Sequence, residues 1–249
     1  MNLRRNKLIV LHEPKIIVLK ARKVASTSFE IALSKFATEN SIITPITEND
    51  ENIRKELGFR GPQNYKYTDG ESLVIDNPKD SKKFHDERDS FKFYNHISAE
   101  NAKCRLGNVI WNSYTKISII RNPFEYTVSI YFFLLSMQGK QPQDVNFEQW
   151  CLANQDKLSL NDDIYNIAGK NVIDIMLNYE RLREDVCLLE SRFGPLKGLA
   201  DTFRGITAKA KIRPEYATVK YMFGQAPKAR DFIADLHSES INKYKFKIP

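Results

Sequence analysis

The chain has 249 residues, of which 42% are hydrophobic and 11% aromatic, so it can bury the core of one full domain. Lysine and arginine total 38 against 31 aspartate and glutamate, and the resulting net charge of +7 favours polyanionic ligands such as nucleotides, acidic polysaccharides or nucleic acids. No stretch approaches the roughly 20 apolar residues of a membrane span, and the apolar run at 8–11 is too short for a secretion signal. We therefore expect a single domain over residues 1–249.

The cysteines argue for a reducing compartment. Cys104, Cys151 and Cys187 are odd in number and widely spaced, with no CxxC pair and no nearby histidine. This pattern predicts neither a disulfide framework nor a metal site, and it favours a cytoplasmic location.

The first elements form a strand, a loop and a helix. Residues 15–19 are apolar and rich in β-branched side chains, which is typical of a buried strand. The apolar residues of 29–36 recur at helical spacing and predict a helix. Residues 44–89 are polar, with several glycines and prolines, and we interpret them as an insertion containing a hairpin at 64–75.

Strands and helices then alternate. The sequence predicts strands at 91–95, 116–120 and 172–179, and helices at 98–104, 123–136 and 180–193. This order predicts an α/β fold in which a central parallel sheet is flanked by helices and ligands bind at the carboxyl ends of the strands.

The loop after the first strand is a candidate phosphate site. A lysine, Lys23, and three hydroxyl residues at 26–28 precede the helix, where backbone N–H groups and the helix dipole favour anions. A plainer interpretation is that Thr27 caps the helix and Glu30 completes a capping box. The chain contains no GxxxxGK[ST] motif, which argues against an ordinary ATPase or kinase.

A second candidate anion site follows the strand at 116–120. Asn122 can cap the next helix, with Pro123 in its first position and Glu125 in its third. Capping does not explain Arg121, whose guanidinium suits bidentate binding of a phosphate at the strand end. Ser129 lies on the first turns of the same helix.

Both segments resemble motifs of one family. The run KVASTSF at 23–29 resembles the 5′-phosphosulfate loop of sulfotransferases that use 3′-phosphoadenosine 5′-phosphosulfate (PAPS), especially carbohydrate 2-O-sulfotransferases and their prokaryotic relatives. Residues 119–131 resemble the family's 3′-phosphate motif, an arginine at a strand end and a serine eight residues later. The resemblance implies a P-loop-like three-layer fold and transfer of a sulfuryl group from PAPS to an acceptor hydroxyl, most simply on a carbohydrate. It requires no metal.

The resemblance also assigns roles to residues. His96 follows a predicted strand and is similar in place to the histidine that serves those 2-O-sulfotransferases as general base. Lys23 would neutralise charge on the leaving phosphate. The expected contacts of PAPS are Arg22, Lys23, Ala25, Ser26, Thr27 and Ser28 at the 5′ end and Arg121, Ser129, Lys211 and Arg213 at the 3′-phosphate.

Two alternatives come from other classes of protein. One is a divergent P-loop kinase, which would need ATP and magnesium. The other is a non-enzymatic binder of polyanions, although the basic residues are spread along the chain without a nucleic-acid-binding motif. In the insertion, Arg60, Tyr65 and Tyr67 are candidate contacts of the acceptor, and the sequence carries no signal for an oligomeric state.

Overall fold

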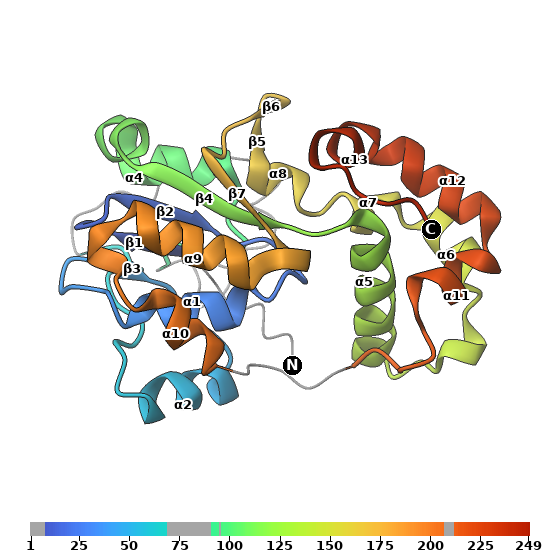
Figure 1. Ribbon diagram of the computed structural model, residues 1–249, viewed down its shortest axis with the longest axis horizontal. Helices are drawn as coiled ribbons and strands as arrows, with labels where there is room; N and C mark the ends of the chain where they lie inside the picture. The colour runs from blue at the N-terminus through green and yellow to red at the C-terminus, as the bar shows by residue number, and fades with distance from the viewer. Residues whose placement is uncertain (1–7, 69–90, 95, 207–211) are drawn as a thin grey trace. The chain divides into compact units, whose positions relative to one another are not determined.

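The computed structural model describes residues 8–68, 91–94, 96–206 and 212–249 (Figure 1). The contacts within the chain define two compact units, and each is described by itself. Unit 1 comprises residues 1–119 and 161–208, and unit 2 comprises residues 120–160 and 209–249. The single domain expected over residues 1–249 stays a prediction.

Unit 1 is built on a five-stranded sheet with the strand order β3-β1-β2-β4-β7. β2 and β4 are parallel, and Ile17 pairs with Lys116, whereas β1 runs antiparallel to both β2 and β3. The strands are short, apolar and largely buried, as expected of a sheet covered on both faces. Their bounds are β1 Leu8–Leu11, β2 Ile16–Leu19, β3 Ile42–Ile43, β4 Thr115–Ile120 and β7 Ile175–Asn178, and a separate small hairpin comprises β5 Asn166–Ile167 and β6 Lys170–Asn171.

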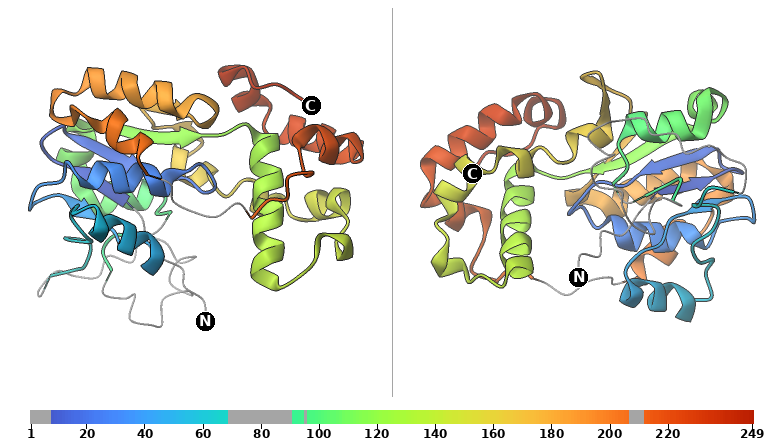
Figure 2. Two further views of the ribbon diagram at one scale, coloured as in Figure 1. Left: turned by 60° about the horizontal axis from the view of Figure 1, so that its bottom comes forward. Right: turned by 180° about the vertical axis from the view of Figure 1, so that it is seen from behind.

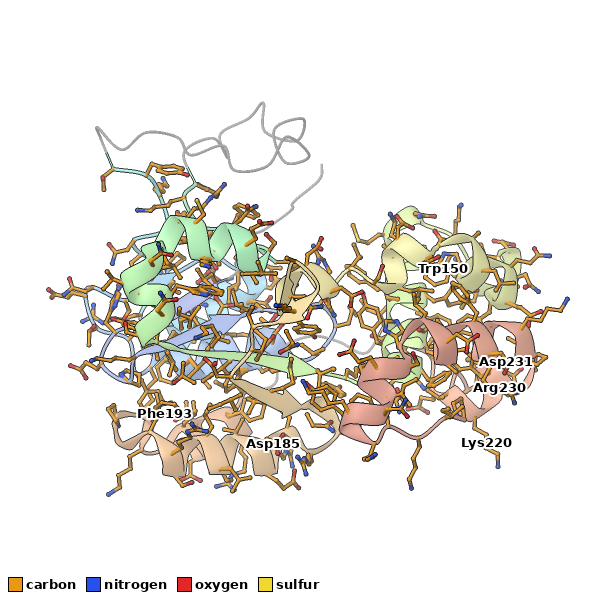
Figure 3. All side chains as sticks on the ribbon, turned by 90° about the horizontal axis from the view of Figure 1, so that it is seen from above. Trp150, Asp185, Phe193, Lys220, Arg230 and Asp231 are labelled. Atoms are coloured by element: carbon orange, nitrogen blue, oxygen red, sulfur yellow. The ribbon has the colours of Figure 1, made fainter. Side chains whose placement is uncertain are left out.

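Helices cover both faces of this sheet. Figure 3 shows α4 on one side of the strands and α9, which ends beside the labelled Phe193, on the other. α1 and α9 both pack on α10, and the rings of Phe29 and Phe203 meet edge to face with their centroids 6.1 Å apart. The α/β fold class with helix, sheet and helix layers is therefore confirmed. The helices of unit 1 are α1 Ser26–Ser34, α2 Glu48–Glu56, α4 Ala99–Ser113, α8 Asp162–Tyr165, η3 Tyr179–Arg181, α9 Leu182–Arg192, η4 Gly194–Leu196 and α10 Leu199–Arg204.

Some elements differ from the sequence predictions. Residues 8–11 form β1, a strand that the hydropathy pattern did not distinguish from a short apolar run. The strand predicted at 91–95 is wrong for the described residues 91–94, which contain only an isolated bridge between Phe91 and Lys66. The helix predicted at 98–104 is followed, after a kink at Gly107 with φ 80°, by a second helical stretch that ends at Ser113. Most of the hairpin predicted at 64–75 lies outside the described residues.

Unit 2 is helical, and aromatic rings form much of its core. Tyr131 of α5 contacts Phe132, Phe147 and Trp150 with ring centroids 5.0–5.2 Å apart, and Trp150 is labelled in Figure 3. Burial raises the pKa of Tyr131 to about 12, and its hydroxyl donates to the carbonyl oxygen of Val145 at 2.6 Å. Figure 2 shows the helices of this unit from two further sides. They are α5 Pro123–Gln138, η2 Pro142–Asp144, α6 Phe147–Ala153, α7 Gln155–Leu158, α11 Val219–Gly224, α12 Pro227–Leu236 and α13 Ser238–Tyr244.

The described part of the chain carries neither a membrane-spanning helix nor a cluster of metal ligands. None of its helices combines the length and apolar character needed to cross a membrane. Within the same residues, His, Cys, Asp and Glu side chains do not gather in any group of three or more that could bind a metal ion. All three cysteines are thiols.

Candidate functional site

The loop between β2 and α1 has an unusual backbone conformation. Lys23 and Ala25 both adopt the left-handed region, with φ values of 60° and 55°. Each costs a non-glycine residue about 1–2 kcal/mol, and such conformations cluster at functional sites. Left-handed residues in a short loop turn successive N–H groups toward one side, which creates a concave site for an anion. The backbone of the loop is compatible with the predicted anion site.

The capping-box interpretation of this loop is wrong. The N-cap of α1 is Ala25, an exposed residue whose side chain has no hydrogen-bonding atom, and Thr27 is already the second residue of the helix. The carboxylate of Glu30 instead contacts Lys20 and Arg54. No side-chain oxygen at the N-cap therefore competes with an anion for the N–H groups of the first turn.

The hydroxyl residues of the loop are buried. Ser26, Thr27 and Ser28 expose 9%, 3% and 8% of their surface. The hydroxyl of Ser26 donates to the carbonyl oxygen of Ala21 at 2.9 Å and so closes the loop on itself. Ser26 therefore shapes the loop, whatever ligand the loop holds.

Four charged side chains form a connected network at the start and end of the loop, which was not predicted from the sequence. Glu30 is 1% exposed and forms ion pairs with Lys20, which is 3% exposed, and with Arg54 of α2 at 3.1 Å. Arg54 is fully buried and also contacts the carboxylate of Glu51 at 3.0 Å. Charged residues are buried only when they are paired, so the four side chains form one structural unit. No periodic pattern in the sequence predicts this network. Glu30 also fits a capping box, and that was the role considered for it from the sequence.

His96 lies beside the same loop. Its Nδ1 is 2.7 Å from the carbonyl oxygen of Lys20, three residues before Lys23. A carbonyl oxygen only accepts, so Nδ1 carries a proton, and in the neutral ring Nε2 has the lone pair that a proton acceptor needs. The backbone of His96 is left-handed, with φ 53°. The structure thus brings His96 and the Lys23 loop together within unit 1.

The other predicted anion site belongs to unit 2. Arg121 NH2 and Arg213 NH1 lie 3.2 Å and 2.5 Å from the same carboxylate oxygen of Glu125, and Arg213 Nε donates to the carbonyl oxygen of Ala217 at 2.6 Å. Ser129 is half-buried on α5, one helical turn after Glu125. Two arginines therefore converge on one oxyanion. Lys211 lies outside the described residues.

The start of α5 follows the sequence prediction. The side-chain oxygen of Asn122 accepts a hydrogen bond from the N–H of Phe124 at 2.9 Å, and Pro123 occupies the first turn. The capping role of Asn122 is confirmed. Arg121, which directly follows the strand, pairs with Glu125 on the first turn of α5.

Comparison with known protein families gives one match. The sequence profile of the sulfotransferase family matches residues 6–184, well over half of the chain. The chain belongs to the sulfotransferase family. The match spans the Lys23 loop, His96, Arg121 and Ser129, and it ends before Arg213. This sulfotransferase therefore transfers sulfuryl groups to a hydroxyl-bearing acceptor, which argues against the kinase and the non-enzymatic binder. No curated protein and no solved structure matches the sulfotransferase significantly.

Proposed function

We propose that this sulfotransferase uses PAPS as its sulfuryl donor and a carbohydrate hydroxyl as its acceptor. The observation that carries the proposal is the hydrogen bond between His96 Nδ1 and the carbonyl oxygen of Lys20, because it places a candidate base beside a loop shaped for an anion. The basic net charge of +7 agrees with an anionic donor. The cytoplasmic location remains a prediction from the cysteines.

The loop would hold the 5′ end of the donor. The backbone N–H groups around Ala25, together with the hydroxyls of Thr27 and Ser28, would contact the 5′-phosphate. The ammonium of Lys23 would stabilise the negative charge that gathers on the leaving phosphate oxygen as the sulfur–oxygen bond breaks. Arg22 and Ser26 would act by shaping the loop.

His96 would be the general base. The acceptor oxygen attacks sulfur, the bond from sulfur to the 5′-phosphate oxygen breaks, and the acceptor proton passes to His96 Nε2. The products are the sulfate ester and adenosine 3′,5′-bisphosphate. The carbonyl of Lys20 would fix the ring and stabilise its protonated form, as a hydrogen-bond acceptor on Nδ1 does in other catalytic histidines.

The 3′-phosphate would be bound in unit 2. A phosphate offers Arg121 and Arg213 more acceptor oxygens and more charge than the single Glu125 oxygen that they share. Ser129 would add a hydroxyl donor. We assign to these residues the selection of PAPS over nucleotides that lack a 3′-phosphate, and we include Lys211 from the sequence alone.

Calorimetric titration with adenosine 3′,5′-bisphosphate tests the donor. We expect the bisphosphate to bind more tightly than adenosine 5′-monophosphate or ATP with magnesium. Arg121→Ala should weaken binding of the bisphosphate far more than binding of the monophosphate. Arg230→Ala, which removes an exposed arginine paired with Asp231, should change neither affinity. Equal losses for both nucleotides in Arg121→Ala would contradict the assignment of the 3′-phosphate.

Turnover measurements test the base. His96→Ala should lower kcat and leave binding of the bisphosphate largely intact. His12→Ala is the matched control, because His12 also makes one ring hydrogen bond, to the Tyr114 hydroxyl at 2.7 Å, outside the loop. Undiminished turnover in His96→Ala would remove its role, and a screen of saccharide acceptors would test the acceptor class.

A further inference from the structure

Asn161 holds the backbone of the candidate phosphate loop through two hydrogen bonds. The N–H of Arg22 donates to Asn161 Oδ1 at 2.8 Å, and Asn161 Nδ2 donates to the carbonyl oxygen of Arg22 at 3.2 Å. The residues are 139 positions apart in the sequence, and both belong to unit 1. The amide group therefore pairs with Arg22 as a neighbouring β-strand would.

The local structure does not require this use of the side chain. Asn161 stands at the N-cap of α8, where an asparagine ordinarily accepts a hydrogen bond from the first turn of its own helix. Its side chain makes no such cap bond, because both ends of the amide are directed to Arg22. Because it binds Arg22, the Asn161 side chain does not cap α8.

The position of the contact gives it a consequence for the reaction. Arg22 directly precedes Lys23, whose left-handed backbone sets the direction of the N–H groups that follow. On the other side of Lys23, the Ser26 hydroxyl holds the carbonyl of Ala21. A left-handed non-glycine residue persists only when its surroundings hold it in place.

We propose that Asn161 is a positioning residue that fixes the Lys23 loop in its anion-binding conformation. The inference rests on the proposed function. A side-chain amide of this length supplies one acceptor and one donor at once, which matches the N–H and the carbonyl of Arg22. A small displacement of a binding group can lower a rate by about 100-fold. Loss of the two Asn161 hydrogen bonds should therefore lower the rate of sulfuryl transfer even though Asn161 itself touches no reacting atom.

Hydrogen exchange of the ligand-free protein is the first test. In Asn161→Ala, amides of residues 20–26 should exchange faster than in the wild type, because the N–H of Arg22 loses its acceptor. Asn64→Ala is the matched control, since the Asn64 amide also makes two hydrogen bonds to backbone, with the carbonyls of Glu39 and Ser41. Unchanged exchange in the loop of Asn161→Ala would overturn the proposal whatever the nucleotide specificity.

Binding and turnover form the second test. Asn161→Ala should weaken adenosine 3′,5′-bisphosphate about 10-fold and lower kcat by about 10- to 100-fold, while Asn64→Ala leaves both unchanged. Faster exchange with unchanged affinity and kcat would show a purely structural residue and overturn the proposal. Failure of the wild type itself to bind the bisphosphate would refute the proposed donor, an outcome visible before any variant is compared.

The conservative variant adds a pH readout. In Asn161→Asp an ionised carboxylate keeps the acceptor for the Arg22 N–H but repels the Arg22 carbonyl, and protonation restores the donor. The affinity of Asn161→Asp should therefore approach that of the wild type as the pH falls from 7.5 to about 4, where an ordinary aspartate takes up its proton, with the wild type measured in parallel. A constant ratio of the two affinities would contradict a role in holding the carbonyl.

Discussion

Glu30→Gln should unfold unit 1 at a much lower denaturant concentration. Glu30 joins two buried cations, Lys20 and Arg54, which are 3% and 0% exposed. Removing one partner of a buried ion pair costs about 3–5 kcal/mol, because the remaining charge stays in a poorly solvated site. Since a neutral amide leaves two cations close together, we expect a loss of about 3–5 kcal/mol in the free energy of unfolding.

The two tryptophans make this loss measurable in one unit. Trp111 lies in α4 of unit 1 and is 5% exposed, whereas Trp150 lies in α6 of unit 2. In a Trp150→Phe background, urea unfolding followed by tryptophan emission reports on unit 1 alone. Glu51→Gln in the same background is the control, because Arg54 then keeps its contact with Glu30.

The control should lose less, about 1.5–3 kcal/mol, the range for hydrogen bonds to a charged group. Equal losses in Glu30→Gln and Glu51→Gln, or a loss below about 1 kcal/mol in Glu30→Gln, would refute the inference that Glu30 neutralises both cations. A double-mutant cycle with Arg54→Met would then show which ion pair is weak.

Three further predictions concern other residues. Lys23→Gly should abolish turnover yet stabilise the protein by up to about 1 kcal/mol relative to Lys23→Ala, because glycine adopts φ 60° without strain; equal unfolding midpoints would contradict this. Burial raises the pKa of Cys151 to about 12, so alkylation at pH 8 followed by mass spectrometry should label the exposed Cys104 and Cys187 first, and early labelling of Cys151 would be contrary to expectation. Burial lowers the pKa of His237 to about 4, so the unfolded state binds the proton first and stability should fall between about pH 6.5 and pH 4; unfolding curves of His237→Gln should lack this part of the decline.

The parts of the fold that the sequence predicted share a simple origin. The strands at 16–19 and 115–120 are rich in β-branched residues, and the start of α5 has a cap and a proline at its first turn. Local chemistry decides such elements. β1 was missed because four apolar residues are too few for their periodicity to separate a strand from a short buried coil.

From the sequence, candidate site residues could be named only near strand ends. Lys23 became a candidate because it lies in the loop after β2, and Arg121 because it directly follows β4. Asn161 could not be predicted, because its partner Arg22 is 139 residues away in the sequence. Its position before α8 is also that of an ordinary N-cap residue. Glu30 was misread for a similar reason, since its true partner Arg54 lies on another helix.

The buried charges of unit 1 constrain how this chain can change. Replacing a complete buried ionic group by apolar residues of similar volume is often neutral or stabilising, although each single replacement is costly. Lys20, Glu30 and Arg54 should therefore vary together among related sequences and be redesigned together in the laboratory. A recombinant chain that takes α1 from one relative and α2 from another would inherit mismatched charges and fold poorly, even if each helix were sound alone.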